Sequence, residues 1–379
     1  MSEFFDLNVG YVSFKNPVAL ASMAGITDSE FAKKTAQDAG LIVIGGYNLD
    51  EETNHAAKIM SGHGRKEFIS EEPMDLIESE LLKLQDINSV VALNVRAVNA
   101  ETYMRAALLA RKYNAVLELD AHCRQPEITS LGAGQELVFD FGKLKGIIHK
   151  IKRTGVVLSV KVRSNVVNNL MLAQLIEEAG ADILHFDAMG AQGSDLRSLK
   201  DVRDATSKIF LIGNNSVHNF EDAQKMFGRG ADMVSVARRA LENPGIFNEI
   251  VSSTSAVQRQ TGWYNAPKHI CGGGDLRGLT FCCLPVKPCV VHAALKKIGM
   301  TAKEFAEIKL DFVKGTPLQY GEGTCFGTMA WCCKATKPCF LRDNVLDAIG
   351  LSGVEYTLLK KRMAEHILSH RKKLVSNDA

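Results

Sequence analysis

Residues 180–186 read Gly-Ala-Asp-Ile-Leu-His-Phe, and residues 230–236 read Gly-Ala-Asp-Met-Val-Ser-Val. In both places a stretch with helical periodicity precedes the glycine, and a short, mostly apolar run follows the aspartate. Glycine commonly follows the last turn of a helix, and a short apolar run is typical of a parallel strand buried on both faces. The two stretches therefore predict the same helix-to-strand turn, made twice.

The same alternation extends from residue 17 to about residue 240. Helices are expected, for example, at residues 101–112, 168–179 and 219–227. Eight strands are expected, at residues 18–21, 41–44, 90–95, 116–119, 156–162, 183–186, 209–212 and 233–236. Eight strand–helix units predict an α/β fold of the (β/α)8 TIM barrel type. The alternative is a doubly wound open sheet, but no G-x-G-x-x-G follows the first strand.

Composition limits the class of protein. The chain has 379 residues, of which 46% are hydrophobic and 23% charged, so it can bury a large core and carry an appendage. A formal net charge of +2 argues against a protein that mainly wraps a polyanion. The first residues show no signal-peptide pattern, and no apolar run approaches the roughly 18 residues of a membrane span. The chain is therefore expected to be cytoplasmic, with no membrane partner.

The domain organisation follows from these patterns. Residues 1–250 are expected to form the barrel, 251–270 a linker, 271–343 a Cys-rich domain and 344–379 C-terminal helices. The last helices carry an apolar stripe and a basic stretch at residues 360–373. That stretch is either a solvated helix end or a docking surface for an acidic electron carrier or RNA.

Polar residues follow the predicted strands, and in a TIM barrel these positions meet at the carboxyl end. A bound phosphate group requires N–H donors from tight turns and a cation, which Asn214, Asn215 and Arg238 can supply. The ammonium of Lys161 can stabilise an anionic ligand at the same end of the barrel. The structural alternatives are an interior ion pair for Lys161 and a simple turn for Asn214.

Residues from about 15 to 250 resemble the dihydrouridine synthase family, FMN-dependent barrels related to dihydroorotate dehydrogenase. Five features carry the resemblance: Ser22-Met23-Ala24-Gly25-Ile26-Thr27-Asp28, Asn94 at a flavin-binding Gln position, Lys161-Val162-Arg163, Gly213-Asn214-Asn215, and Val236-Ala237-Arg238 with the following Asn243-Pro244. The resemblance implies FMN as cofactor. The implied cofactor-binding residues are Ser22, Met23, Ala24, Asn94, Lys161, Arg163, Asn214, Asn215, Ala237 and Arg238, and the implied catalytic residues are Cys123 and Lys161.

The chain also departs from that family. Around Cys123 the family has Asn-x-Gly-Cys-Pro, whereas this chain has Asp120, His122 and Arg124. Asp187 and Met189 replace the family's His-x-Arg, and His185 is expected on the other face of that strand. These changes predict that the substrate pocket has been rebuilt, and they leave a uracil ring in tRNA as an alternative substrate only. Three roles stay open for Cys123: a proton donor, a nucleophile or a small buried apolar residue.

Eight of the nine cysteines form a repeat. Both halves read C…C-C-x-x-x-K-P-C, with the thiols at Cys271, Cys282, Cys283, Cys289 and at Cys325, Cys332, Cys333, Cys339. In a reducing compartment, four thiols per unit predict two metal centres, either [4Fe–4S] clusters or structural Zn. Clusters are favoured, because a flavin can exchange single electrons with them. Redox thiols or disulfides are the third alternative, and one cysteine of each adjacent pair can remain a free thiol.

The whole chain resembles the methanogenesis marker protein 9 family of methanogenic archaea, through Cys-Gly-Gly-Gly-Asp-Leu-Arg and Cys-Cys-x-x-x-Lys-Pro-Cys. The expected function is an FMN-dependent iron–sulfur oxidoreductase linked to methanogenesis. It would exchange electrons between two [4Fe–4S] clusters and a conjugated small molecule, with a redox protein or methanogenic enzyme as a further partner. The alternatives are a tRNA-dihydrouridine synthase, with tRNA as partner, and a non-catalytic electron-carrying assembly factor.

Overall fold

The structure is a computed structural model. It describes residues 4–206 and 208–261, Tyr264, and short stretches between Gly299 and His366. The chain divides into two compact units, one spanning Leu7–Ser252 and one made of Met1–Asp6 with Ser253–Ala379. The eight cysteines between positions 271 and 339 lie outside the described residues, so the metal centres predicted for them stay predictions.

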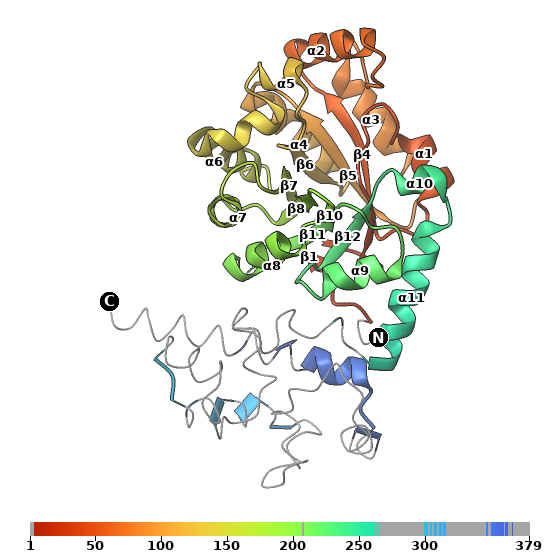
Figure 1. The fold of residues 1–379 in the computed structure, drawn as a ribbon, viewed down its shortest axis with the longest axis vertical. Helices are drawn as coiled ribbons and strands as arrows, with labels where there is room; N and C mark the ends of the chain where they lie inside the picture. Colours follow the sequence, from red (N-terminus) through yellow and green to blue (C-terminus); the bar gives the residue numbers. More distant parts are fainter. Residues whose placement is uncertain are drawn as a thin grey trace. The chain divides into compact units, whose positions relative to one another are not determined.

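The first unit is a closed barrel of eight parallel strands (Figure 1). The ring closes where β12 pairs with β3, with Val234 opposite Val18. The (β/α)8 prediction is therefore confirmed, and the doubly wound open sheet is excluded. In ring order the strands are β3 (Val18–Leu20), β4 (Leu41–Asn48), β5 (Val90–Arg96), β6 (Val116–Asp120), β7 (Leu158–Arg163), β8 (Ile183–Asp187), β11 (Phe210–Asn214) and β12 (Met233–Val236).

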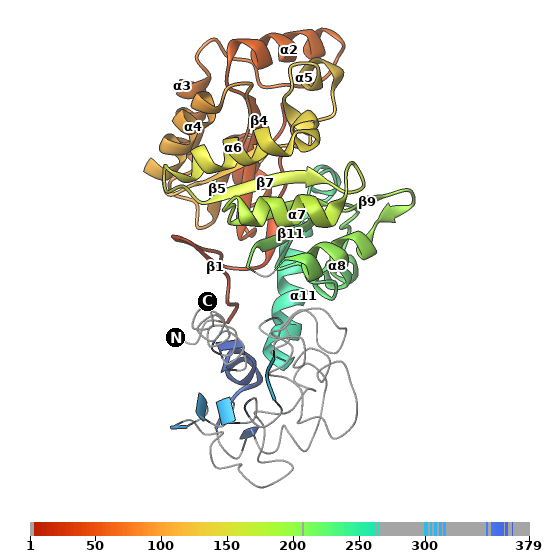
Figure 2. The same ribbon diagram turned by 90° about the vertical axis from the view of Figure 1, so that its left-hand side faces the viewer.

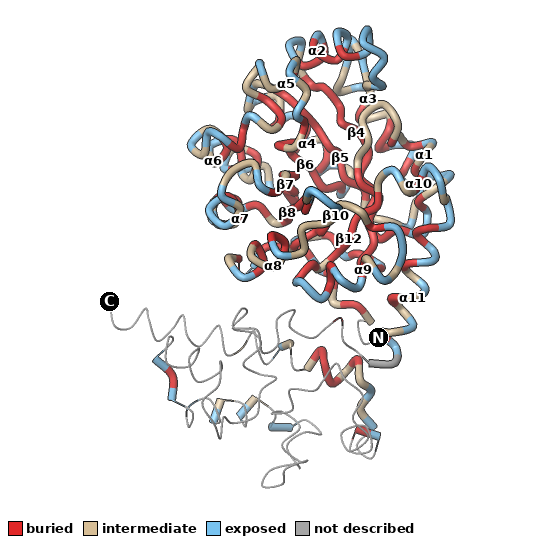
Figure 3. Tube along the Cα trace, viewed as in Figure 1, coloured by how far each residue is buried: buried red, intermediate tan, exposed pale blue. Residues whose placement is uncertain are grey.

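Helices surround the strands, and their inner faces are buried while their outer faces are exposed (Figures 2 and 3). The helices that follow the strands are α1 (Ser29–Thr35), α2 (Glu51–Gly62), α3 (Pro73–Lys83), α4 (Ala100–Lys112), α6 (Phe141–Lys152), α7 (Asn169–Glu178), α8 (Leu196–Ala205), α9 (Phe220–Phe227) and α10 (Arg239–Glu242). A short α5 (Pro126–Thr129) and a 3-10 helix (Gly134–Phe139) precede α6, and α11 (Ile246–Thr261) follows α10. No described helix is both long enough and apolar enough to span a membrane.

The repeated Gly-Ala-Asp turn fixes strand register. Gly180 and Gly230 have φ of +94° and +104°, the left-handed conformation that favours glycine. Asp182 Oδ2 then accepts a hydrogen bond of 2.8 Å from Leu158 N, at the start of the neighbouring strand. Asp232 Oδ2 likewise accepts one of 2.9 Å from Leu211 N. In both turns the aspartate therefore links the start of its own strand to the start of the neighbouring strand.

A two-stranded hairpin lies at the amino ends of the strands. It consists of β1 (Asn8–Val9) and β2 (Val12–Ser13), which pair antiparallel. The Tyr11 hydroxyl donates to Ala115 O, just before β6, and accepts from Val157 N, just before β7, at 2.7 and 3.2 Å. Because the hairpin occupies this end, the carboxyl end of the barrel is the face left for a ligand. A second hairpin, β9 (Met189–Gly190) with β10 (Gly193–Ser194), follows β8 at that carboxyl end.

Candidate active site at the carboxyl ends of the strands

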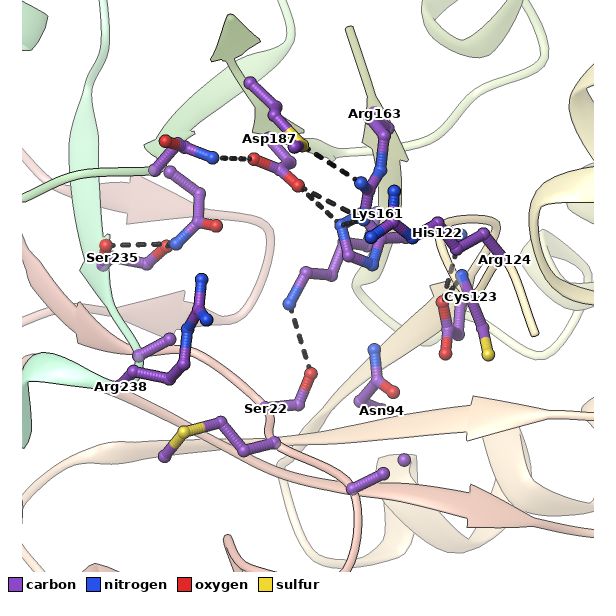
Figure 4. Close-up of a pocket in the computed structure, with 18 of the residues that line it drawn as sticks. Ser22, Asn94, His122, Cys123, Arg124, Lys161, Arg163, Asp187, Ser235 and Arg238 are labelled. Carbon is purple, nitrogen blue, oxygen red and sulfur yellow. Dashed lines mark hydrogen bonds and ion pairs between the residues drawn. The ribbon is translucent and has the colours of Figure 1, made fainter. Parts of the chain in front are cut away.

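A cavity of about 800 Å³ opens at the carboxyl end of the barrel (Figure 4). This volume falls within the usual range for a small-molecule or cofactor site. All eleven residues predicted above to bind the cofactor or to act in catalysis line this cavity. The barrel topology brings them together from six strands, although they are spread over more than 200 positions of the sequence.

The turn after β3 places Ser22, Met23 and Ala24 in the cavity wall. Its shape is held by the Thr27 hydroxyl, which accepts a hydrogen bond from Met23 N at 2.8 Å and lies 3.2 Å from Gly45 O. Asp28 then caps α1 by accepting from Phe31 N at 2.8 Å. The compact turn keeps Ser22, Met23 and Ala24 beside the cavity.

Lys161 extends from β7 into the same space. The residue is only 4% exposed, and its Nζ lies 3.2 Å from Ser22 Oγ. Among the described residues, this hydroxyl is the hydrogen-bond partner of the ammonium, and no carboxylate forms an ion pair with it. A buried ammonium that forms no ion pair is costly, so the cavity is suited to an anionic or electron-rich ligand at this point. Within the part of the chain that the structure describes, the interior ion pair considered for Lys161 is not formed, although Glu118 is near enough for the charge of Lys161 to lower its pKa.

A buried polar network lies beneath Lys161. Glu118 accepts hydrogen bonds from Asn94 Nδ2 and Ser159 Oγ, both at 2.9 Å, and pairs with His185 Nδ1 at 2.8 Å. Burial alone would raise the pKa of Glu118, but His185, Lys161 and the hydrogen bonds lower it to about 2. His185 Nε2 continues the chain to Ser235 Oγ at 2.8 Å. Since Asn94 uses its Nδ2 on Glu118, its Oδ1 remains available as a hydrogen-bond acceptor.

Glu118→Gln should change how stability depends on pH. The pKa of Glu118 in the folded chain, about 2, is below the ordinary value of 4.5. Its ionised form therefore stabilises the fold above about pH 4.5, and this contribution is lost as the pH falls toward 2. Urea unfolding should show Glu118→Gln less stable than wild type at pH 7, with the gap narrowing below pH 4.5. The exposed Glu136→Gln variant serves as control, and a gap that stays constant with pH would contradict the assignment.

The turn after β11 has an unusual backbone. Asn215 and Ser216 have φ of +99° and +52°, which residues with a side chain rarely adopt and which cluster at ligand sites. Hydrogen bonds lock the turn: Asn214 Nδ2 donates to Ser235 Oγ at 2.6 Å, and Ser194 Oγ donates to Asn215 O at 2.7 Å. Asn214 is therefore more than a simple turn residue, although its amide nitrogen is already used within the protein.

The cavity as a whole is strongly cationic. Eight of its lining residues are Lys or Arg, and two are Asp. The Arg239 Nε is buried and has no hydrogen-bond partner among the described residues. This donor set, together with the constrained turn after β11, fits the phosphate and the pyrimidine carbonyls of FMN.

A second ionic cluster joins the loop after β6 to β8. His122 Nε2 lies 2.6 Å from Asp187 Oδ2 and 2.9 Å from Arg163 Nη2. Asp187 Oδ1 accepts from Asn215 Nδ2 at 2.9 Å. Although burial opposes it, the hydrogen bond and charge of His122, with Asn215 and Arg163, hold the pKa of Asp187 well below its usual range.

The prediction that His185 lies on the other face of β8 from Asp187 is wrong, because residues two apart on a strand share a face. His185 points into the barrel, as its bonds to Glu118 and Ser235 require.

Cys123 lies in a mixed environment. It is 8% exposed and packs with an apolar cluster that includes Ala57 and Met60, but its Sγ also lies 3.2 Å from Arg96 Nη1. Burial raises the pKa of the thiol, and Arg96 opposes this shift. The thiol is therefore protonated at neutral pH, which suits a proton donor or a buried apolar residue better than a nucleophile.

Sequence reasoning did not assign a role to several residues of the site. Arg96 is 1% exposed and pairs with the buried Glu67 at 2.5 Å, from the segment between α2 and α3. Glu118 was missed although a charged residue inside an apolar strand is itself a signal. His122 and Asp187 were noticed only as departures from a pattern, and their contact spans 65 positions of the chain.

Comparison with known proteins places this geometry in a family. The family model described as "Dihydrouridine synthase (Dus)" matches residues 66–270, just over half of the chain. An uncharacterised protein of Methanocaldococcus jannaschii is 38% identical over 59% of this chain and 89% of its own length. The tRNA-dihydrouridine synthase B of Pasteurella multocida is 23% identical over 65% of this chain and 72% of its own.

A solved structure agrees with the fold. The dihydroorotate dehydrogenase of Eimeria tenella, determined in complex with ferulenol, superposes with a TM-score of 0.52 at 16% identity. The match covers 70% of this chain and 86% of that one, and at this identity it bears on the fold alone. The barrel, the cationic cavity above its strands and the family match agree, and the chain belongs to the dihydrouridine synthase family of flavin-dependent oxidoreductases.

Proposed function

We propose that the chain is an FMN-dependent iron–sulfur oxidoreductase acting on a conjugated small molecule. The observation that carries the flavin part is Lys161, a buried ammonium that enters a cationic cavity with a hydroxyl as its partner. Bound FMN supplies hydride transfer and one-electron chemistry at that position. Two [4Fe–4S] clusters in residues 271–343 would exchange electrons with it, and a link to methanogenesis is supported by the relative in Methanocaldococcus jannaschii.

Each end of the cavity has a role in this proposal. The turn at Asn214 and Asn215 would bind the phosphate through its backbone, and Arg238, from the loop after β12, would add a charge. At the other end Lys161 would donate to the pyrimidine edge, and Asn94 Oδ1 would be available to accept from a ring N–H. Ser22, Met23 and Ala24 of the turn after β3 would help to exclude water from the bound cofactor. The thiol of Cys123 lies in the same cavity and would serve as the proton donor.

Arg238→Ala should weaken FMN binding by about 1.5–3 kcal/mol, the usual size of a charge-assisted contact. Arg238 is exposed at the rim, so its removal should not disturb the barrel core. Binding is measured by quenching of FMN fluorescence during titration of the full-length protein. Arg197→Ala is the control, since the Arg197 side chain is 92% exposed and does not line the cavity. Folded wild-type protein that takes up no FMN would refute the proposal.

A tRNA-dihydrouridine synthase is the second candidate, supported by the name of the Pasteurella multocida relative. The residues around Cys123 argue against it, because Asp120, His122 and Arg124 stand where the family has Asn, Gly and Pro. Mapping dihydrouridine in the tRNA of a deletion strain separates the two proposals. Loss of a specific dihydrouridine would establish the tRNA activity, and an unchanged map would leave the small-molecule reaction.

A further inference from the structure

A second cavity of about 560 Å³ adjoins the first, beside the β9–β10 hairpin. The two cavities share Arg124, Arg163, Met189 and Gly190. The remaining wall consists of uncharged residues, and no Asp or Glu is among the lining residues that the structure describes. This second cavity is therefore electropositive and shares a wall with the first.

Arg163 is poorly satisfied for a buried guanidinium. Its side chain is 14% exposed, its Nη1 contacts the Met189 sulfur at 3.1 Å, and its Nε has no hydrogen-bond partner among the described residues. A thioether is a weak acceptor. The closest carboxylate oxygen is Asp187 Oδ2, 3.6 Å from Nη2, and Asp187 is already bound by His122 and Asn215.

The contact between Arg163 and His122 is conditional. His122 Nε2 can accept from Arg163 only when that nitrogen carries no proton. When it carries one, it donates to Asp187 Oδ2 at 2.6 Å, and Arg163 Nη2 loses its acceptor. The guanidinium then presents unpaired donors, the arrangement that binds a planar carboxylate through two parallel hydrogen bonds.

Arg124 adds a second charge at the same place. It is exposed, and it lines the first cavity (Figure 4) as well as the second. Burial is the largest cause that lowers the pKa of Arg163. The charge of Asp187 raises this pKa, and repulsion from the charge of Arg124 lowers it further. Two guanidiniums close enough to repel each other are stabilised by an anion between them.

We propose that the second cavity binds the carboxylate of the substrate, through Arg163 and Arg124, while the conjugated part of the substrate extends into the first cavity. This inference rests on the proposed function and adds a substrate class, a planar conjugated carboxylic acid. A small acid is favoured over an RNA backbone, because Arg163 is largely buried and the chain has a net charge of only +2.

The test compares matched acids and amides. Full-length protein saturated with FMN is titrated with benzoate and benzamide, and with cinnamate and cinnamamide, by calorimetry and by the change in the flavin spectrum. At least one acid should bind ten or more times more tightly than its amide. Arg163→Gln should abolish that preference, Arg163→Lys should keep part of it, and Arg124→Gln should reduce it about threefold. Arg197→Gln is the matched control, since the Arg197 side chain is 92% exposed and lines neither cavity.

The outcomes are separable. Equal binding of acid and amide in both pairs, or a preference that survives in Arg163→Gln protein with unchanged thermal stability, overturns the subsite. A short single-stranded RNA that binds wild type but neither arginine variant, with no acid preference, assigns the surface to RNA instead. Failure of wild type to bind FMN rejects the proposed function, and calorimetry on the FMN-free protein still decides the carboxylate subsite.

Discussion

Arg96→Met should lower the free energy of unfolding by about 3–5 kcal/mol, the usual cost of breaking a buried ion pair from one side. Arg96 is 1% exposed, and its Nη2 lies 2.5 Å from Glu67 Oε2 and 2.9 Å from Gly46 O. Without the guanidinium, Arg65 is the one ion-pair partner left to the buried Glu67 carboxylate among the described residues, with its Nε 2.8 Å from Oε1. The free energy is measured by urea unfolding at pH 7.

A double-mutant cycle separates the energy of the Arg96–Glu67 ion pair from the effect of replacing the large Arg96 side chain. Arg96→Met with Glu67→Leu removes both charges, so the double variant should recover much of the stability lost by Arg96→Met alone. The coupling energy should exceed 1 kcal/mol, because the two groups are in direct contact. If Arg96→Met is no less stable than the exposed Arg197→Ala, the ion pair contributes nothing to the fold.

The barrel was predictable because its signal is local. Each strand is a short apolar run between turn signals. The Gly-Ala-Asp turns at residues 180–182 and 230–232 form the same hydrogen bond from the neighbouring strand to the aspartate. The composition of the cavity was predictable for a related reason. Once the fold is a barrel, the inward-facing residues at the carboxyl ends of the strands share one space, whatever their distance along the chain.

The partners within the cavity were not predictable in the same way. A pattern gives the residue type at each strand end but not which neighbour it meets, and Arg96 meets Glu67 from a loop that carries no periodic signal. Glu118 required a different argument, since a carboxylate inside a buried strand must find donors, and these come from Asn94, Ser159 and His185 on three other strands. The face of β8 on which His185 lies could have been predicted, because side chains alternate along a strand and His185 therefore shares its face with Asp187.

The second large expected effect is the loss of iron when cysteines of the Cys-rich repeat are replaced. Full-length protein purified without oxygen should hold about eight irons and eight acid-labile sulfides, the content of two [4Fe–4S] clusters. Cys289→Ser and Cys339→Ser should each remove about four irons, because a hydroxyl is a far poorer ligand for iron than a thiolate. Iron and sulfide are measured chemically, and the electron paramagnetic resonance spectrum of the reduced protein reports the cluster that remains.

Cys123→Ser is the matched control for these variants, since Cys123 lies in the barrel cavity outside the repeat and its replacement should leave the iron content unchanged. Adjacent cysteines point apart in an extended chain, so Cys282→Ser and Cys283→Ser decide which member of that pair is a ligand. If neither lowers the iron content, the four-thiol unit is wrong. Stoichiometric zinc without sulfide, in protein from an iron-replete anaerobic host, would exclude clusters altogether. The flavin would then have to receive its electrons directly from a soluble donor, because zinc has no accessible redox state with which to pass them on.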